Sequence, residues 1–347
     1  MLGSTTRRLL FGLAGTGLCA TGLASGPARA ADPAPVIALS NAYYGNTWRH
    51  QMVEAFQAAA EQAKAKGAIA DYVNLNGDGS VNQQMSQMSD LILKHVSAIV
   101  IDAASETALN GIIVKACQAG ITVLAFDSIV SAPCAYKLNF DFIGYQAKLT
   151  TDALHLIGDK GNVVVVRGVK GSAPDHDMYE SQMATLKNYP NVKIVATVYG
   201  QATGSVAQAA VANVLPSLPH VDAVLAQGGG DDYGIAQAFT QFGGPYAAKP
   251  PVIAGGGSAN FIHWWADEAK NNGYQTVSMN TTPGIGGAAF WLTLDIVKGA
   301  KAKNYMVMPV ATVTAANLGA YADMKPGTIV SPVYSQEWVE QNLLNQH

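Results

Sequence analysis

Short apolar runs alternate with longer amphipathic stretches from residue 35 to the C-terminus. The apolar runs are continuous, which is typical of strands in parallel sheets that are buried on both faces. They predict strands at 35–40, 71–75, 98–101, 121–126, 162–167, 192–199, 222–227, 252–255 and 275–279. A further extended apolar run covers residues 305–314.

The stretches between these runs carry apolar residues at helical spacing. In the first of them Met52, Phe56 and Ala59 share one face, and Gly67 follows as a C-cap. Ser80-x-x-Gln83 is a capping box that begins the second. Helices are predicted at 48–66, 80–95, 107–118, 175–188, 205–215, 231–242, 259–271, 284–298 and 336–344. Repeated βα units predict two doubly wound α/β lobes with parallel sheets.

The first thirty residues have the pattern of an export signal. Arg7 and Arg8 precede a short apolar stretch, and Ala28-Arg29-Ala30 forms an A-x-A cleavage site. We expect cleavage between Ala30 and Ala31, with the twin-arginine and the general secretory routes both open. The protein is therefore expected in the periplasm.

Composition narrows the class of protein. The 347 residues are 49% hydrophobic and 13% charged, which excludes a disordered chain. The net charge of -3 becomes -6 without residues 1–30, which carry three arginines and no acidic residue, so nothing favours nucleic-acid binding. No later stretch reaches the roughly 18 apolar residues of a membrane helix.

Two cysteines remain beyond the predicted signal, Cys117 and Cys134. Export exposes them to oxidising conditions, where a disulfide between them is plausible. Cys134 lies in an irregular loop that can fold back on the helix carrying Cys117. Two buried free thiols are the alternative interpretation.

Polar and aromatic residues follow the predicted strands at their carboxyl ends, where ligands bind in open α/β sheets. Aromatic rings cover the apolar face of a sugar, and charged groups form strong hydrogen bonds to hydroxyls. This combination predicts a polyhydroxylated ligand in a cleft between the lobes. The candidate ligand-binding residues are Tyr43, Tyr44, Asn46, Trp48, Asp102, Asp127, Arg167, Asp231, Asp232, Asn260 and Asn280.

Structural roles compete with ligand binding at several of these positions. Asp102 also suits a helix N-cap, and Asp231 and Asp232 stand at a helix start that favours carboxylates in any case. Trp48 is equally suited to packing, and Arg167 to a structural ion pair. Asp127 is also suited to a hinge.

The order and spacing of several short motifs resemble the periplasmic sugar-binding proteins of ABC transporters, of the ribose-binding type I group. The resemblance covers essentially all of the chain after residue 30. The motifs that show this resemblance are Asn41-x-Tyr43-Tyr44 with Trp48, Asn82-Gln83-Gln84, Ala98-Ile99-Val100-Ile101-Asp102, Gly120-Ile121-Thr122-Val123 with Phe126-Asp127, Gln227 with Asp231, and Pro283-x-x-x-Gly287.

This resemblance implies two lobes joined by a three-crossover hinge that closes on the ligand. The lobes would be residues 31–135 with 283–303, and 136–275 with 309–347, with crossovers at 276–282 and 304–308. It further implies stacking of the sugar on Tyr43 and Tyr44, hydroxyl contacts at Asp102, Asp231 and Asn280, delivery to an ABC permease, and a monomer.

Two departures from the family pattern leave the sugar unnamed. Asp175-His176-Asp177 stands where sugar binders usually carry an arginine, and Gly256-Gly257-Ser258 where they usually carry an aspartate. Arg167 is the candidate replacement for the cation.

The sequence gives little support for an enzymatic function. The sequence has no G-x-S-x-G, Walker lysine or H-E-x-x-H. Gly284-x-Gly286-x-x-Ala289 is interpreted as helix packing rather than a dinucleotide site, and no metal or cofactor is expected. The enzyme alternative is a secreted α/β hydrolase acting on carbohydrate, with Asp102 and Asp231 as its carboxyl pair. A ligand-sensing receptor on the same fold is a third interpretation.

Overall fold

The computed structural model describes residues 3–6, 8–11 and 33–345. The chain divides into two units, residues 1–33 and 34–347, and every helix and strand described below belongs to the second unit. Most of the predicted export signal, including its cleavage site at Ala30–Ala31, lies outside the described residues. Within the described ranges, no helix combines the length and the apolar character that crossing a membrane requires.

The first half of the fold, built mostly from the N-terminal part of the chain, contains a six-stranded parallel sheet in the order β11-β5-β4-β3-β1-β2. Its strands are β1 (Val36–Asn41), β2 (Asp71–Asn76), β3 (Ala98–Asp102), β4 (Thr122–Phe126), β5 (Tyr136–Phe140) and β11 (Tyr305–Met308). The helices packed on this sheet are α1 (Thr47–Ala65), α2 (Val81–Leu93), α3 (Asn110–Gln118) and α10 (Ile285–Val297).

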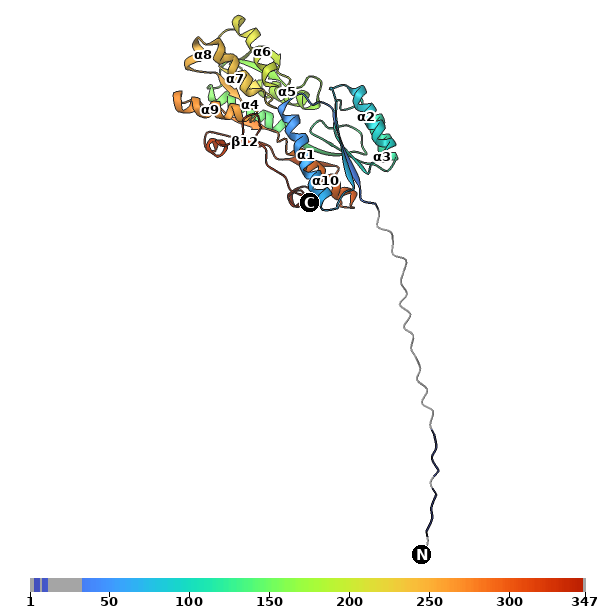
Figure 1. Ribbon diagram of the computed structural model, residues 1–347. Coiled ribbons are helices and arrows are strands. Elements are labelled where there is room, and N and C mark those ends of the chain that lie inside the picture. The colour runs from blue at the N-terminus through green and yellow to red at the C-terminus, as the bar shows by residue number, and fades with distance from the viewer. Residues whose placement is uncertain (1–2, 7, 12–32, 346–347) are drawn as a thin grey trace. The chain divides into compact units, whose positions relative to one another are not determined.

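Both faces of this sheet are covered, as its continuous apolar strands predict. Ile37 and Leu39 of β1 belong to the core that α1 and α10 form, whereas Ala38 belongs to the core under α2 and α3. Figure 1 shows α1 and α10 side by side on one face, with α2 and α3 on the other. Gly286 permits this close packing, because a Cβ there would lie 2.2 Å from the carbonyl oxygen of Met52 in α1.

A second parallel sheet of four strands has the order β7-β6-β8-β9. Its strands are β6 (Gly161–Arg167), β7 (Val192–Tyr199), β8 (Ala223–Ala226) and β9 (Val252–Ala254). The associated helices are α4 (Phe142–Leu156), α5 (Ala173–Leu186), α6 (Gly204–Val214), α7 (Asp232–Phe242), α8 (Pro245–Ala248) and α9 (Ala259–Asn272), with a 3-10 turn at Leu215–Ser217.

The C-terminal part of the chain links the two sheets. Strand β10 (Ser278–Asn280) pairs antiparallel with β12 (Ala311–Val313) and touches the second sheet through a bridge from Ser278 to Gly255. A 3-10 turn at Leu318–Tyr321 follows, then α11 (Gln336–Val339) and a π-helical turn at Glu340–Leu344. The structure confirms the predicted fold class of two parallel-sheet α/β layers.

Three details of the predicted boundaries need correction. Strand β5, expected in the second lobe, hydrogen-bonds to β4 in the first sheet. Residues 305–308, expected as a crossover, form the edge strand β11 of the same sheet. The last helix was expected in the second lobe with residues 309–347, but it packs on α10 of the first half, where Gln336 donates to Asp295 at 2.6 Å.

The segment between β4 and α5 also holds two elements that the sequence analysis missed, β5 and α4. Strand β5 reads Tyr-Lys-Leu-Asn-Phe and follows a Pro/Cys loop, so it lacks the continuous apolar run that marks the other strands. With these shifts, the chain passes between the halves after β5, after β10, after β11, and again near residues 331–335.

Cys117 and Cys134 form a disulfide with their Cα atoms 6.5 Å apart. It joins the end of α3 to the irregular loop between β4 and β5, which folds back as the sequence suggested. This loop begins with two residues of the site described next.

Candidate functional site

A pocket lies between the carboxyl ends of the strands of the two sheets. Its wall from the first half comes from the start of α1, the loop after β4 and the segment after β10. Its wall from the second half comes from α4, from the start of α5 and from the loops after β6, β7 and β8. The lining residues are Asn46, Trp48, Arg49, Asp127, Ser128, Phe142, Tyr145, Gly168, Val169, Ser172, Pro174, Asp175, Met178, Ala202, Gln227, Gly228, Gly229 and Thr281.

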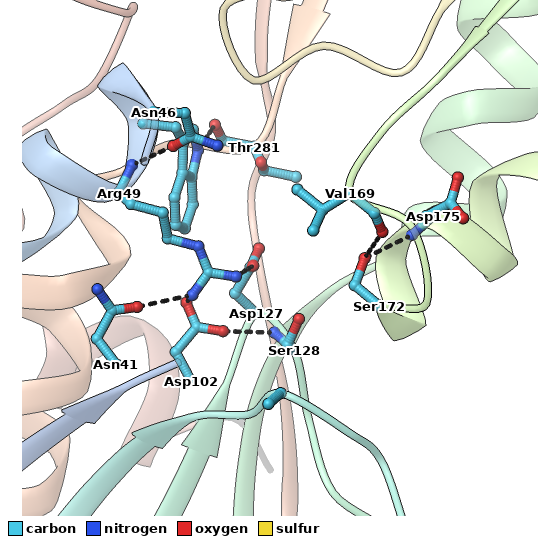
Figure 2. A network of polar contacts seen from close by, with 12 residues as sticks. Asn41, Asn46, Arg49, Asp102, Asp127, Ser128, Val169, Ser172, Asp175 and Thr281 are labelled. Atoms are coloured by element: carbon cyan, nitrogen blue, oxygen red, sulfur yellow. Dashed lines mark hydrogen bonds and ion pairs between the residues drawn. The ribbon is translucent and has the colours of Figure 1, made fainter. Parts of the chain in front are cut away.

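The first wall is organised around the buried guanidinium of Arg49. Its Nη1 pairs with Asp102 at the end of β3 and donates to Asn41 at 3.0 Å, and its Nη2 lies 3.6 Å from Asp127. Figure 2 shows the three acceptors converging on this one cation from the ends of neighbouring strands. Asp102 is fully buried, and its other oxygen accepts from the backbone N–H of Ser128 at 3.3 Å.

Charge and burial act against each other in this group. Burial lowers the pKa of Arg49, while Asp127 acts to raise it. Burial raises the pKa of Asp127, opposed by the nearby Arg49. Two carboxylates share one guanidinium here, so this wall carries an excess of negative charge when both are ionised. Among the described residues, the Asp127 carboxylate makes a single long ion-pair contact, so it has acceptor capacity left toward the pocket.

The start of α1 supplies the other groups of this wall. Asn46 is the N-cap of α1, and its Oδ1 accepts from the N–H of Arg49 at 2.8 Å. Trp48 is 4% exposed and donates from Nε1 to the carbonyl of Thr281 at 2.8 Å, which fixes the indole ring against the pocket. The Ser128 hydroxyl is buried and has no hydrogen-bond partner among the described residues.

Asp175 is the charged group on the opposite wall. It stands in the first turn of α5, whose N-cap Ser172 also lines the pocket. Arg167, at the end of β6, clamps this carboxylate with two hydrogen bonds of 3.0 and 2.7 Å. The guanidinium is itself held against two aromatic rings, 4.0 Å from the Tyr179 centroid and 4.9 Å from that of Tyr199.

Gln227 holds the loops of this wall together. Its Oε1 accepts from the N–H of Gly168 at 2.7 Å, and its Nε2 donates to the carbonyl of Asp175 at 3.2 Å. Its own carbonyl accepts from the Tyr145 hydroxyl at 3.1 Å. Burial, with smaller effects of Asp231 and Asp127, raises the pKa of Tyr145, so this residue is a neutral aromatic surface with a fixed hydroxyl.

The structure brings three of the predicted ligand residues to the pocket, Asn46, Trp48 and Asp127. Tyr43 and Tyr44 are absent from its lining. Tyr43 lies over Gly45 and bridges to Asp78, whereas Tyr44 is 36% exposed and stacks on His50 with ring centroids 3.9 Å apart. The aromatic rings that do line the pocket are those of Trp48, Phe142 and Tyr145.

Asp102 and Arg167 do not line the pocket themselves. Each pairs with a lining residue: Asp102 with Arg49, and Arg167 with Asp175. Asp232 is buried and accepts from the N–H groups of Gly256 and Ser258, so it joins the loops after β8 and β9.

The remaining candidates, Asn280, Asn260 and Asp231, also lie outside the pocket lining. Asn280 donates to the carbonyl of Val330 at 2.9 Å, and Asn260 accepts from Gly327 at 3.0 Å. Asp231 is fully buried at the start of α7, where burial and the adjacent Asp232 raise its pKa well above the ordinary value.

Sequence reasoning missed Arg49, Ser128, Phe142, Tyr145 and Asp175 as pocket residues. Arg49 follows Trp48 on a helix, where an arginine ordinarily faces solvent. Asp175 did appear in the sequence as a departure from the family pattern, and Ser128 directly follows the candidate Asp127. Nothing in the local pattern marks Phe142 and Tyr145, because their helix was not predicted. Among the described residues, no group of three or more His, Cys, Asp or Glu is placed to hold a metal ion.

Comparison with known proteins agrees with this architecture. The periplasmic binding protein domain family matches residues 37–301, most of the chain. The chain belongs to this family. An ABC transporter solute-binding protein from Thermobispora bispora is 39% identical, with a TM-score of 0.83 over 88% of this chain and 94% of that one.

Curated relatives of the family are more distant. The multiple sugar-binding periplasmic receptor ChvE of Rhizobium radiobacter is 30% identical over 217 residues, 56% of this chain and 60% of the receptor. The xylitol-binding protein of Mycolicibacterium smegmatis is 26% identical over 183 residues, 52% of each chain. The match thus spans only half to three fifths of these relatives. An ABC transporter periplasmic solute-binding protein from Actinobacillus succinogenes, solved with bound D-allose, shares the fold at 19% identity, with a TM-score of 0.70 over 83% of this chain and all of that one.

Proposed function

We propose that this protein captures a neutral sugar or polyol between its two sheets and delivers it to an ABC permease. The observation that carries the proposal is the pocket where both sheets end, because it combines three buried aromatic rings with carboxylates held in fixed positions. The rings suit the C–H faces of a sugar, and carboxylates accept strong hydrogen bonds from hydroxyls. Several family members bear names of sugar or polyol binders, which supports the same ligand class.

The charges of the pocket favour a neutral ligand over an acidic one. Arg49 is the only cationic side chain among the described residues that line it, and it already faces Asp102 and Asp127. Arg167 is matched by Asp175 in the same way. An anionic ligand would therefore meet two carboxylates without a free cation, and its desolvation would have no compensation.

We further propose that the halves move relative to each other and that the bound ligand bridges them. Asp127 and Asp175 belong to different halves, and both line the pocket. A ligand that contacts both walls gains contacts only when the halves approach, so it shifts the population toward a closed form. The predicted export signal, a periplasmic location and a monomeric state are part of the same proposal.

The hydrolase alternative needs two carboxyl groups facing one substrate. The proposed pair does not line the pocket: both oxygens of Asp102 are engaged, one by Arg49 and one by the N–H of Ser128, and Asp231 is fully buried. This arrangement favours binding over hydrolysis. The receptor alternative shares the ligand pocket and differs only in the partner.

A thermal-shift screen tests the proposal, because a ligand that binds the native state raises the unfolding temperature. D-allose, D-arabinose, xylitol and myo-inositol form the neutral panel, and glucuronate, ribose 5-phosphate and glutamate form the charged panel. We expect a concentration-dependent increase with at least one neutral compound and none with the charged ones. An increase confined to the charged panel would contradict the proposal.

A further inference from the structure

The loop between β4 and β5, residues 127–135, contributes Asp127 and Ser128 to the pocket. It is irregular along its whole length, so no strand or helix ladder holds it in place. Its position depends on the buried side chains of Val130 and Ala132 and on separate attachments along the loop. The placement of the two pocket residues therefore depends on what those attachments are.

Three attachments, spaced three residues apart, tie this loop to the segment after β3. The carbonyl of Ser128 accepts from the N–H of Ala103 at 2.9 Å. Ser131 donates its N–H to Glu106 at 2.9 Å, and its hydroxyl accepts from Asn110 at 2.7 Å. Cys134 completes the series through its disulfide to Cys117. The hydrogen bonds at Ser131 lie at the surface, where water competes for them, so the disulfide is the firmest outer attachment.

The backbone at the start of the loop is in an uncommon conformation. Asp127 has a φ of +55°, in the left-handed region that is uncommon for residues other than glycine, although aspartate enters it more readily than most. Its N–H donates to Leu138 of β5 at 3.1 Å, so the two strands that flank the loop fix one side. The other side is fixed by the attachments to residues 103–117 and by the buried side chains of Val130 and Ala132, which pack in the core under α2 and α3.

The pocket network joins the same loop. The N–H of Ser128 donates to Asp102, which pairs with Arg49, and Arg49 in turn faces Asp127. A displacement of the loop thus moves both the Asp127 carboxylate and one of the hydrogen bonds of Asp102. The disulfide lies seven residues from Asp127, and Cys134 is exposed to solvent, so a reductant reaches it.

We propose that the Cys117–Cys134 disulfide positions the ligand-binding loop, so that breaking it weakens ligand binding before the protein unfolds. This inference rests on the proposed function for its effect on affinity. Its effect on the loop itself does not depend on which ligand binds. The disulfide restricts the conformations open to residues 127–134, and without it Asp127 leaves its left-handed conformation more often.

Hydrogen exchange of the backbone amides tests the positioning role without a ligand. We compare the oxidised protein with Cys117→Ser/Cys134→Ser. In a second arm dithiothreitol reduces the wild-type disulfide: two electrons and two protons pass to the cysteines, giving two thiols and the cyclic oxidised reagent. Both treatments should speed exchange at Asp127 and Ser128 by about tenfold or more. Exchange within β8 of the second sheet should stay unchanged.

Isothermal titration with D-allose, D-arabinose, xylitol and myo-inositol then measures the effect on affinity. We expect about a tenfold weaker affinity in the variant for whichever of these compounds the oxidised protein binds. Ile262→Val, a cavity-forming change in the core of the second half, is the control for lost stability and should bind as the wild type does. Far-UV circular dichroism checks that all forms are folded at the temperature used.

The outcomes separate the two ideas. Unchanged exchange at Asp127 and Ser128, or a lower unfolding temperature with unchanged affinity, would overturn the positioning role and leave the disulfide as a general stabiliser. If the oxidised protein binds none of the four compounds, the proposed function fails, while the exchange rates still decide the role of the disulfide.

Discussion

Replacing Arg49 by methionine removes the one cation that two buried carboxylates share. Methionine keeps the apolar part of the stem, so the change mainly deletes the hydrogen bond to Asn41 and the pairing with Asp102 and Asp127. Asp102 is 0% exposed and cannot regain water by a small rotation. The variant must therefore hold an unpaired buried carboxylate or protonate it.

The expected loss of stability at pH 7 is about 3–5 kcal/mol, the usual cost of removing one partner of a buried ion pair. The pH dependence follows from the sign of the pKa shifts. Burial already raises the pKa of Asp127, and removing the cation that opposes this shift raises it further. A raised pKa in the folded state means that protonation stabilises the fold. The deficit of Arg49→Met should thus be largest at pH 7 and shrink as the pH falls through the raised pKa of Asp127.

Urea unfolding followed by far-UV circular dichroism measures this loss at pH 7 and pH 5. The double variant Arg49→Met/Asp102→Asn should recover part of the stability, because it removes the unpaired charge as well. Lys64→Met is the matched control: its ion pair with Asp71 is exposed, and we expect no measurable change. A loss below about 1 kcal/mol for Arg49→Met, or a double variant that is less stable than the single one, would refute the reasoning.

Three further substitutions test the assignment of roles in the pocket. Asp127→Asn should weaken binding of a neutral polyol by about 10- to 100-fold, as expected for a lost charged acceptor. Since burial raises the pKa of Asp127, the affinity of the wild type should fall as the pH drops through that pKa. In titrations from pH 4 to 8, the affinity of the variant should not change with pH. Arg167→Met releases the clamp on Asp175 and should lower affinity about tenfold by calorimetry, whereas unchanged affinity would place Asp175 outside the set of ligand contacts. Tyr44→Ala should leave affinity within about twofold, because the ring stacks on His50 away from the pocket, and a larger loss would return the stacking role to Tyr44.

Much of the fold follows from the sequence because buried parallel strands leave an unmistakable pattern. The Val-rich run of β6 and the run of β3 are apolar throughout, since helices cover both faces. Strand β5 escaped prediction because it alternates polar and apolar residues near the edge of the sheet, next to β11. Pairing across more than 160 residues, as between β5 and β11, has no local signal at all.

The sequence predicted the location of the pocket better than it predicted which residues line it. Strand ends correctly indicated where the pocket lies, and Asn46, Trp48 and Asp127 line it. The sequence alone does not distinguish a carboxylate that lines the pocket from one that pairs with the arginine behind it, which is the difference between Asp127 and Asp102. That distinction depends on how far Arg49 reaches from its helix.

Hydrogen exchange with and without a bound neutral sugar tests the central claim most directly. If a polyol bridges the two halves, saturation with it should protect amides on both walls at once, at residues 127–128 and at residues 168–178. Asp127→Asn should remove the protection on both walls together. Protection of one wall alone, or of a surface away from these residues, would contradict the account.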